Sequence, residues 1–203
     1  MTNMTPTLQA RADRKSAKQD KKKRQIADSA ITALHELGYA NTSLRDIAAK
    51  SEMSLGILHY YFEDRSDLII FCVRIYKQEF VAGIRHALDR AKGRDAVIDA
   101  LAGALAVSIT KDASTHRLWY DIRNQALFDD RFQPVTSEIE TTLVSMVSHA
   151  FMRAGHATPP RVELQYALLD GVFRFLLQDQ LCGTFRSTKA TKAIFAQILK
   201  QVL

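Results

Sequence analysis

The sequence contains few of the residues that interrupt helices: its 203 residues include only eight Gly and four Pro. Long helices can therefore run without a break, because these two residues are the poorest helix formers. No segment shows the alternation of polar and apolar residues that marks a strand, and no internal repeat is present. We therefore expect an all-α protein, for which a hydrophobic content of 47% supplies an ample core.

Residues for metal or covalent chemistry are also scarce. The six histidines show no metal-ligand spacing, and no glycine-rich phosphate loop is present. The two cysteines, Cys72 and Cys182, lie in apolar helical patterns without a neighbouring His. Two buried, reduced thiols are the simpler interpretation, and a disulfide or a redox sensor is the alternative. We expect no metal, no cofactor and no catalytic residue.

Long hydrophobic runs are absent as well. No uncharged run exceeds about a dozen residues, which is short of the roughly 20 residues that a membrane-spanning helix needs. The N-terminal segment lacks the apolar centre of a secretion signal. We therefore expect a cytoplasmic protein with no membrane partner.

Positive charge is concentrated near the N-terminus. Residues 11–24 hold eight bases and two acids, so their net charge equals the +6 of the whole chain. The rest of the sequence is neutral in sum. A basic arm on a neutral body favours a polyanion such as nucleic acid as a partner, although solvated tails have the same composition.

Apolar residues at helical spacing predict about nine helices after the basic arm. Gly38 is expected to end the first of them in a left-handed cap, and Gly155 to end another. The expected helices cover approximately residues 21–37, 42–51, 55–62, 64–92, 95–110, 114–128, 134–154, 161–181 and 188–202.

Residues 43–62 have the spacing of a helix-turn-helix. Thr42 or Ser43 caps the first helix, Glu52 and Met53 form the turn, and Ser54 caps the second helix. A short turn of this kind makes the helices cross steeply, so the second can enter a DNA major groove ~12 Å wide. An ordinary helical hairpin with its aromatic residues in a core is the alternative interpretation.

The outer face of the second motif helix carries groups that suit DNA. His59 and Tyr60 offer hydrogen-bond donors for phosphate, and His59 also for a base edge. Leu55 and Ile57 suit thymine methyl groups. Gly56 costs the helix about 1 kcal/mol relative to Ala, and its missing side chain permits close approach of the backbone to DNA. Other candidates offer hydroxyl, backbone N–H or charged groups near the helix ends. They are Thr42, Ser43, Arg45, Ser54 and Arg65.

This region resembles the TetR family of bacterial transcriptional regulators. The family pattern begins with Thr-Thr or Thr-Ser and continues roughly as I-A-x-x-A-G-V-S-x-G-x-L-Y-x-[YH]-F-x-x-K-x-x-L. The resemblance covers about residues 22–70, a third of the chain at most. The corresponding residues here are Thr42, Ser43, Ile47, Ala48, Ser51, Glu52, Met53, Ser54, Gly56, Leu58, His59, Tyr60, Tyr61, Phe62, Arg65 and Leu68.

Three departures from the family pattern affect the motif. Ser51 and Glu52 replace Ala-Gly, so the turn must form without its usual glycine. His59 replaces the usual Tyr, which puts the phosphate contact expected there in doubt. Arg65 replaces Lys and keeps the charge.

The resemblance implies a homodimer whose two recognition helices enter successive major grooves of a palindromic operator, ~34–36 Å apart. In the family the last two helices of each subunit form the interface, which here means about residues 161–181 and 188–202. The residues give independent support, because segment 161–181 is apolar on more than one side. A helix buried deeply within a monomer is the alternative.

The resemblance also implies a small-molecule pocket in the C-terminal bundle. Segments 117–132 and 168–179 resemble the ligand domain of the BetI-type group. Most of the candidate residues could equally be ordinary core packing, and a buried arginine would need Asp121, Asp170 or a ligand carboxylate as its partner. The candidates for the pocket lining are Trp119, Tyr120, Arg123, Phe128, Met146, Phe173 and Arg174.

The sequence thus predicts three parts: a flexible basic arm (1–20), a helix-turn-helix DNA-binding domain (21–66) and a ligand-binding and dimerisation domain (67–203). The predicted function is that of a ligand-relieved repressor, with an operator duplex and an unknown small-molecule effector as partners. A helical enzyme or small-molecule-binding protein that uses the C-terminal pocket is the alternative. A third possibility is an interaction module whose arm binds an acidic protein or a membrane surface.

Overall fold

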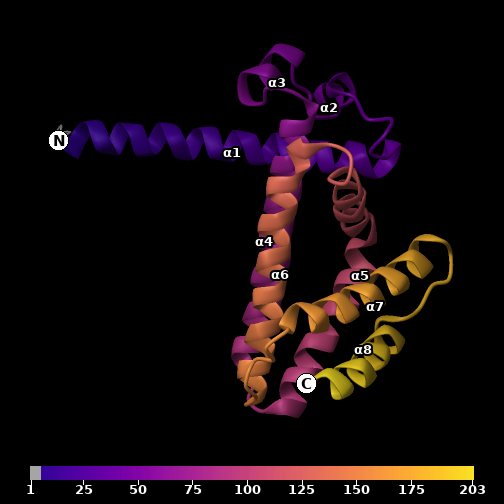
Figure 1. The fold of residues 1–203 in the computed structure, drawn as a ribbon. Coiled ribbons are helices and arrows are strands. Elements are labelled where there is room, and N and C mark those ends of the chain that lie inside the picture. The colour runs from indigo at the N-terminus through magenta and orange to yellow at the C-terminus, as the bar shows by residue number, and fades with distance from the viewer. Residues whose placement is uncertain (1–5) are drawn as a thin grey trace. The chain divides into compact units, whose positions relative to one another are not determined.

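The computed structural model describes the backbone of residues 6–203 and the side chains from residue 17 onward. This part of the chain contains eight α-helices, one 3-10 segment and no strand, which confirms the all-α prediction (Figure 1). The first five residues of the predicted arm lie outside the described range. The elements are α1 Pro6–Leu37, α2 Leu44–Lys50, α3 Leu55–Tyr61, α4 Arg65–Arg90, α5 Arg94–Gln125, η1 Asp130–Phe132, α6 Gln133–Ala154, α7 Val162–Leu181 and α8 Thr188–Val202.

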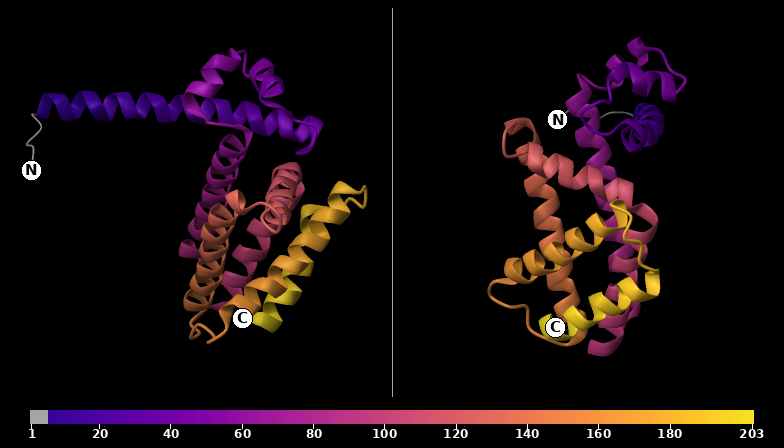
Figure 2. Two further views of the ribbon diagram at one scale, coloured as in Figure 1. Left: turned by 45° about the horizontal axis from the view of Figure 1, so that its top comes forward. Right: turned by 90° about the vertical axis from the view of Figure 1, so that its right-hand side faces the viewer.

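Helix α1 begins well before the predicted start near Lys21, so residues 6–20 of the predicted flexible arm are helical. The physical reason is composition: no Gly or Pro occurs between Thr7 and Leu37, and Ala, Gln, Lys and Arg are strong helix formers. In Figures 1 and 2 the first half of α1 extends beyond α2 and α3.

The chain divides into two compact units, Met1–Cys72 and Val73–Leu203, and the division falls within α4. The first unit has its own core, in which Cys72 is completely buried. Burial raises the pKa of the Cys72 thiol, which keeps it neutral. The prediction that both cysteines are buried is wrong for Cys182, which is exposed because α7 ends at Leu181.

Both motif helices are capped as predicted. The Ser43 hydroxyl accepts a hydrogen bond from the Asp46 amide at 3.3 Å, and the Asp46 carboxylate accepts one from the Ser43 amide at 2.8 Å. The Ser54 hydroxyl accepts a hydrogen bond from the Ile57 amide at 3.3 Å. These bonds satisfy N–H groups that a helix start otherwise leaves without partners, and they fix where α2 and α3 begin.

The turn between α2 and α3 is strained at Glu52, whose φ of 53° makes it the one non-glycine residue with positive φ in the described chain. A side chain in this left-handed region costs roughly 1–2 kcal/mol. The Met53 amide still donates to the Ala48 carbonyl at 3.0 Å, so the turn closes without a glycine.

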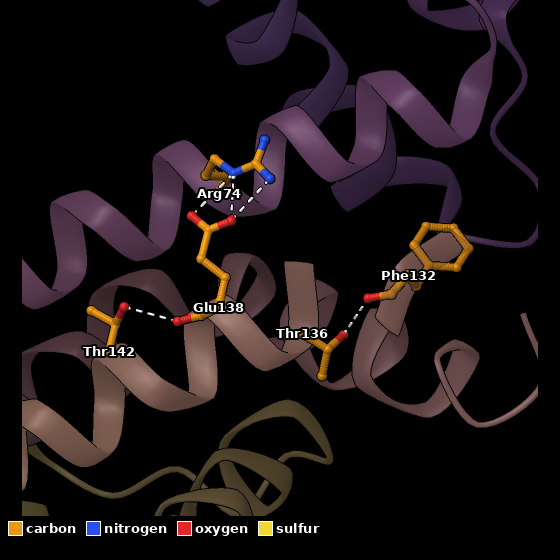
Figure 3. Close-up of polar contacts among 5 residues, drawn as sticks. All are labelled: Arg74, Phe132, Thr136, Glu138 and Thr142. Atoms are coloured by element: carbon orange, nitrogen blue, oxygen red, sulfur yellow. Dashed lines mark hydrogen bonds and ion pairs between the residues drawn. The ribbon is translucent and has the colours of Figure 1, made fainter. Parts of the chain in front are cut away.

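In the second unit, α5 packs against α6, α7 and α8. Part of α4 lies beside α6, and Figure 3 shows Arg74 of α4 forming an ion pair with Glu138 of α6, with Nη2 and Oε2 3.0 Å apart. The same view shows Thr136 donating to the Phe132 carbonyl of η1 and Thr142 donating to the Glu138 carbonyl of α6. None of the described helices is long and apolar enough to cross a membrane.

Segments 95–110 and 114–128, predicted as two helices, form most of a single α5 with a kink at Asp112 (φ −121°, ψ 24°). Side chains on the two sides of the kink are joined, because Ser108 hydrogen-bonds the His116 ring. The other ring nitrogen of His116 bonds the Tyr76 hydroxyl from α4. Burial lowers the pKa of His116 to about 2, so the ring is neutral and both of its nitrogens have partners.

We expect Glu52→Gly to raise the free energy of unfolding by about 1 kcal/mol, because glycine adopts the left-handed conformation without steric cost. Chemical denaturation followed by circular dichroism measures the change. Ala49→Gly, an exposed substitution within α2, is the matched control and should destabilise by about 1 kcal/mol. A loss of stability in both variants would show that the turn is not strained.

Candidate functional site

Helix α3 has one buried side and one open side. Leu58 is fully buried beneath it, whereas Ile57 and Tyr60 are 41% and 69% exposed. Ser54, Gly56 and His59 are exposed as well, and Leu55 is half-buried. The predicted reading residues of α3 therefore lie together on a surface made of hydroxyl, imidazole, phenol and aliphatic groups.

Tyr60 lies where α3 approaches the basic part of α1. Its hydroxyl accepts a 3.5 Å hydrogen bond from the Gln19 side chain, and its ring stands edge-on to Tyr61, with the ring centroids 5.0 Å apart. Lys18, Lys21 and Arg24 of the same stretch of α1 are exposed. The phenol is thus held beside a cluster of positive charge.

Gly56 has no packing reason to be glycine. A Cβ placed there would meet only the Ser54 hydroxyl oxygen, at 4.0 Å, which is an ordinary contact. The residue is exposed and lies in the first turn of α3. The missing side chain leaves bare backbone on the outer surface.

Three further candidates serve the fold of the motif in this structure. Thr42 is only 2% exposed and donates to the Gly38 carbonyl at 2.7 Å, so the prediction that its hydroxyl faces outward is wrong. The Ser43 hydroxyl is occupied in the capping box. Arg65 donates through Nε to the Thr42 carbonyl at 2.5 Å, and also to the Tyr39 carbonyl, which ties down the loop before α2. Arg45 is exposed on α2.

The second unit contains a cavity that is partly open to solvent. Of the predicted lining residues, Tyr120, Met146 and Phe173 belong to its wall. Helices α4, α5, α6 and α7 all contribute. The other residues of the wall are Lys77, Phe80, Leu101, Leu105, Leu143, Val147, Tyr166, Leu169 and Asp170.

Four predicted lining residues lie elsewhere. Phe128 is 87% exposed, because it follows the end of α5 and no helix covers it. Trp119 is fully buried but is not part of the cavity wall. Arg174 is exposed, with its guanidinium 5.7 Å from the centre of the Tyr120 ring. Arg123 lines a separate, open surface hollow.

One aspartate organises the polar side of the cavity. Asp170 accepts hydrogen bonds from the Tyr120 hydroxyl at 2.9 Å and from Arg123 Nη1 at 2.5 Å. Arg123 also pairs through Nε with Glu140 at 2.7 Å. Asp170, rather than Asp121, is therefore the partner of the half-buried Arg123. Burial and the Asp170 charge raise the pKa of Tyr120, which keeps it a donor.

Lys77 is the functional candidate that the sequence analysis missed. It is 4% exposed, and its ammonium lies over the rings of Phe80 and Trp119, 4.9 and 5.0 Å from their centres. Burial lowers its pKa to about 7. The available signal was its spacing, four residues from each of Val73 and Val81, which puts a charge on an apolar stripe.

We expect the stability of the protein to rise between pH 7 and 8.5, because Lys77 has a folded-state pKa of about 7 and an ordinary value of 10.5. In that range the unfolded chain binds more protons than the folded chain. The contribution from this lysine is roughly 1.5 kcal/mol. Urea unfolding at several pH values measures it.

Lys77→Met should flatten this pH dependence and stabilise the protein at pH 7, since it removes the cost of a buried charge. Lys111→Met, at an exposed position on α5, is the control and should leave the slope unchanged. Equal slopes in the wild type and in Lys77→Met would contradict the assignment of the effect to this residue.

The first unit contains a segment that matches a known protein family. Residues 26–70 match the sequence model of the family described as bacterial regulatory proteins, tetR family. The chain is 26% identical over 145 residues to the HTH-type transcriptional regulator HbdR of Aromatoleum sp. (strain CIB), which covers 66% of this chain. It spans less than two thirds of that relative, since the match covers 61% of HbdR.

Two further proteins resemble the chain over most of its length. The HTH-type transcriptional regulator BetI of Burkholderia thailandensis is 25% identical over 175 residues, covering 82% of this chain and 85% of BetI. A transcriptional regulator from Rhodococcus sp. Rha1 has the same fold, with a TM-score of 0.76 at 15% identity, covering 89% of this chain and 95% of that one. The narrower resemblance to a BetI-type group stays a prediction.

Residues 26–70, which include the helix-turn-helix of the first unit, match the family model, and the relatives of similar sequence are HTH-type transcriptional regulators. These similarities support a regulator of the TetR type, whose family signature this chain carries in residues 26–70.

Proposed function

We propose that this protein is a cytoplasmic repressor that binds a palindromic operator as a homodimer and releases it when a small molecule occupies the cavity of the second unit. Residues 21–66 are the DNA-binding domain in this proposal, and residues 67–203 bind the ligand and form the dimer. The observation that carries it is the open face of α3, which lies within the part of the chain that matches the family model. The names of the relatives support a regulator rather than an enzyme.

Two features of α3 support its insertion into a major groove. Gly56 weakens the helix by about 1 kcal/mol relative to Ala, yet no neighbour in the described chain needs its space. A close approach between the backbone of α3 and DNA would explain why a glycine stands there despite this cost. Tyr60, 69% exposed beside the basic stretch of α1, is placed to donate to a phosphate.

An apolar stripe on α7 supports the homodimer. Leu164, Leu168 and Phe175 are 50%, 60% and 61% exposed and lie on one side of the helix, with Gly171 between them. A surface hollow beside this stripe is lined by Leu168, Gly171 and Phe175, and also by Ile194 and Ile198 of α8. Exposed apolar residues on α7 beside half-buried ones on α8 form a patch of the kind that is typical of a protein interface. A second copy of the stripe, related by a twofold axis, would cover it.

Helix α4 supports coupling between the ligand and DNA. It begins at Arg65, which holds the loop before α2, and it continues without interruption to Lys77 and Phe80 of the cavity wall. A ligand shifts DNA affinity only if it binds one arrangement of the reading helices better than the other. A cavity wall formed partly by α4 gives the ligand a direct contact with that helix.

We expect Tyr60→Ala to lower operator affinity by roughly tenfold, or about 1.4 kcal/mol, because it removes a phosphate donor and leaves the buried side of α3 intact. Fluorescence anisotropy with duplexes from the region upstream of the protein's own gene measures the affinity. The melting temperature should stay within a few degrees of the wild type. Phe128→Ala, another exposed aromatic residue, is the matched control and should bind normally.

Gly56→Ala separates folding from binding in the same assay. It should stabilise the helix, since Ala is the better helix former, and weaken operator binding, since the added methyl group lies where DNA would approach. Wild-type affinity in both Tyr60→Ala and Gly56→Ala would remove α3 from the DNA interface.

We expect Leu168→Glu to convert the dimer to a monomer, because a charge on the centre of the α7 stripe would be buried without a partner. Sedimentation velocity measures the mass, and operator affinity should fall with it. Met152→Glu, at a 60% exposed position on α6, is the control and should remain dimeric. A dimeric Leu168→Glu variant would place the interface elsewhere.

A further inference from the structure

We propose that the cavity of the second unit binds a small carboxylate with an apolar body, and that its carboxylate pairs with the Lys77 ammonium and accepts a hydrogen bond from the Tyr166 hydroxyl. This inference rests on the proposed role of the cavity as the effector site, and it adds the chemical class of the effector.

Lys77 is a buried cation without a hydrogen-bonded counterion. Its neighbours within about 5.5 Å are the aromatic faces of Tyr76, Phe80 and Trp119, and no described residue accepts a hydrogen bond from its ammonium. A cation above an aromatic ring is attracted to the electron-rich face of the ring. Removing an ammonium from water costs more free energy than this attraction returns, so the rings offset only part of that cost. A ligand anion would supply the missing pair.

The nearby carboxylates do not fill that role. Asp170 is hydrogen-bonded to both Arg123 and the Tyr120 hydroxyl, and Glu140 pairs with the same arginine. Both acids are thereby committed to Arg123. Asp170 raises the pKa of Lys77 only through its charge, and burial, which lowers that pKa, has the larger effect.

Tyr166 supplies a second donor. It is 9% exposed and belongs to the same cavity wall, and its hydroxyl is buried with no hydrogen-bond partner in the described chain. Buried hydroxyl groups without partners are uncommon, because each loses its bonds to water. The Tyr166 hydroxyl and the Lys77 ammonium, neither of which donates a hydrogen bond within the described chain, share one cavity. The complementary group is an anionic oxygen acceptor.

The remaining wall determines the body of the ligand. The wall also contains Leu101, Leu143 and Leu169, together with Phe80 and Phe173. Such a surface favours hydrocarbon and offers no donor or acceptor of its own. An amphiphilic acid with one head group and an aliphatic or aromatic body fits both sides of the cavity.

The protein carries its own reporter for this site. Trp119 is the sole tryptophan of the chain, and its ring centre is 5.0 Å from the Lys77 ammonium. An anion that pairs with Lys77 changes the field at this indole. Its fluorescence therefore measures binding with the full-length protein and without DNA.

The test titrates the protein at pH 7 with octanoate and phenylacetate, and with matched neutral and cationic analogues: octan-1-ol, 2-phenylethanol and octylamine. We expect saturable quenching or shift of Trp119 emission by at least one carboxylate, at least tenfold tighter than with its alcohol. Lys77→Met should abolish that preference, and Tyr166→Phe should reduce it. Lys111→Met, exposed on the same α5 that carries Trp119, should behave as the wild type.

Lys77→Gln serves as a second variant if Lys77→Met does not fold. No saturable binding of either carboxylate, equal affinity for an acid and its alcohol, or an unchanged preference in the folded variant would overturn the proposal. Operator binding is measured separately by anisotropy. Carboxylate binding without operator release would contradict the proposed regulation alone, whereas operator release by the alcohol would contradict the ligand class alone.

Discussion

The commitment of Asp170 to Arg123 is the interaction on which the chemistry of the second unit depends. One carboxylate holds a guanidinium and a phenol, and together with Glu140 it leaves the arginine fully paired. A second cation, Lys77, is left in the same apolar bundle without such a partner. If Asp170 bound Lys77 instead, the charge of this lysine would be neutralised within the protein. In the present arrangement the charge of Lys77 gives the cavity a positive potential.

In the first unit, polar side chains near the motif form hydrogen bonds within the unit, whereas the outer face of α3 stays exposed. Thr42 and Arg65 hydrogen-bond loop carbonyls, and Ser43 caps α2. Each of these groups has a polar side chain that superficially suits DNA. The hydrogen bonds of these groups fix the position of α3, whose outer side chains are exposed. Affinity for DNA therefore depends on residues that hold the motif as well as on those that face outward.

The sequence was sufficient for the all-helical class, the caps and the motif, because these depend on local spacing. Gly38, Ser43 and Ser54 lie at the helix ends that the pattern predicts. The long α1 was missed because charge density was weighed above helix propensity. Thr42 and Phe128 were misassigned because burial depends on contacts distant in sequence, which hydroxyl or aromatic character does not reveal. Lys77 could not be predicted for a related reason: the hydrophobic members of an apolar stripe indicate burial, but not which partner a charged residue among them has.

The kink of α5 gives the ring of His116 a structural role. Asp112 departs from helical geometry within a helix of 32 residues, and the Ser108–His116 hydrogen bond spans that departure. The ring of His116 also touches Phe80 and Phe173 of the cavity wall, with centroids 5.0 and 4.8 Å away. One imidazole therefore links the wall of the cavity to the bend of the helix.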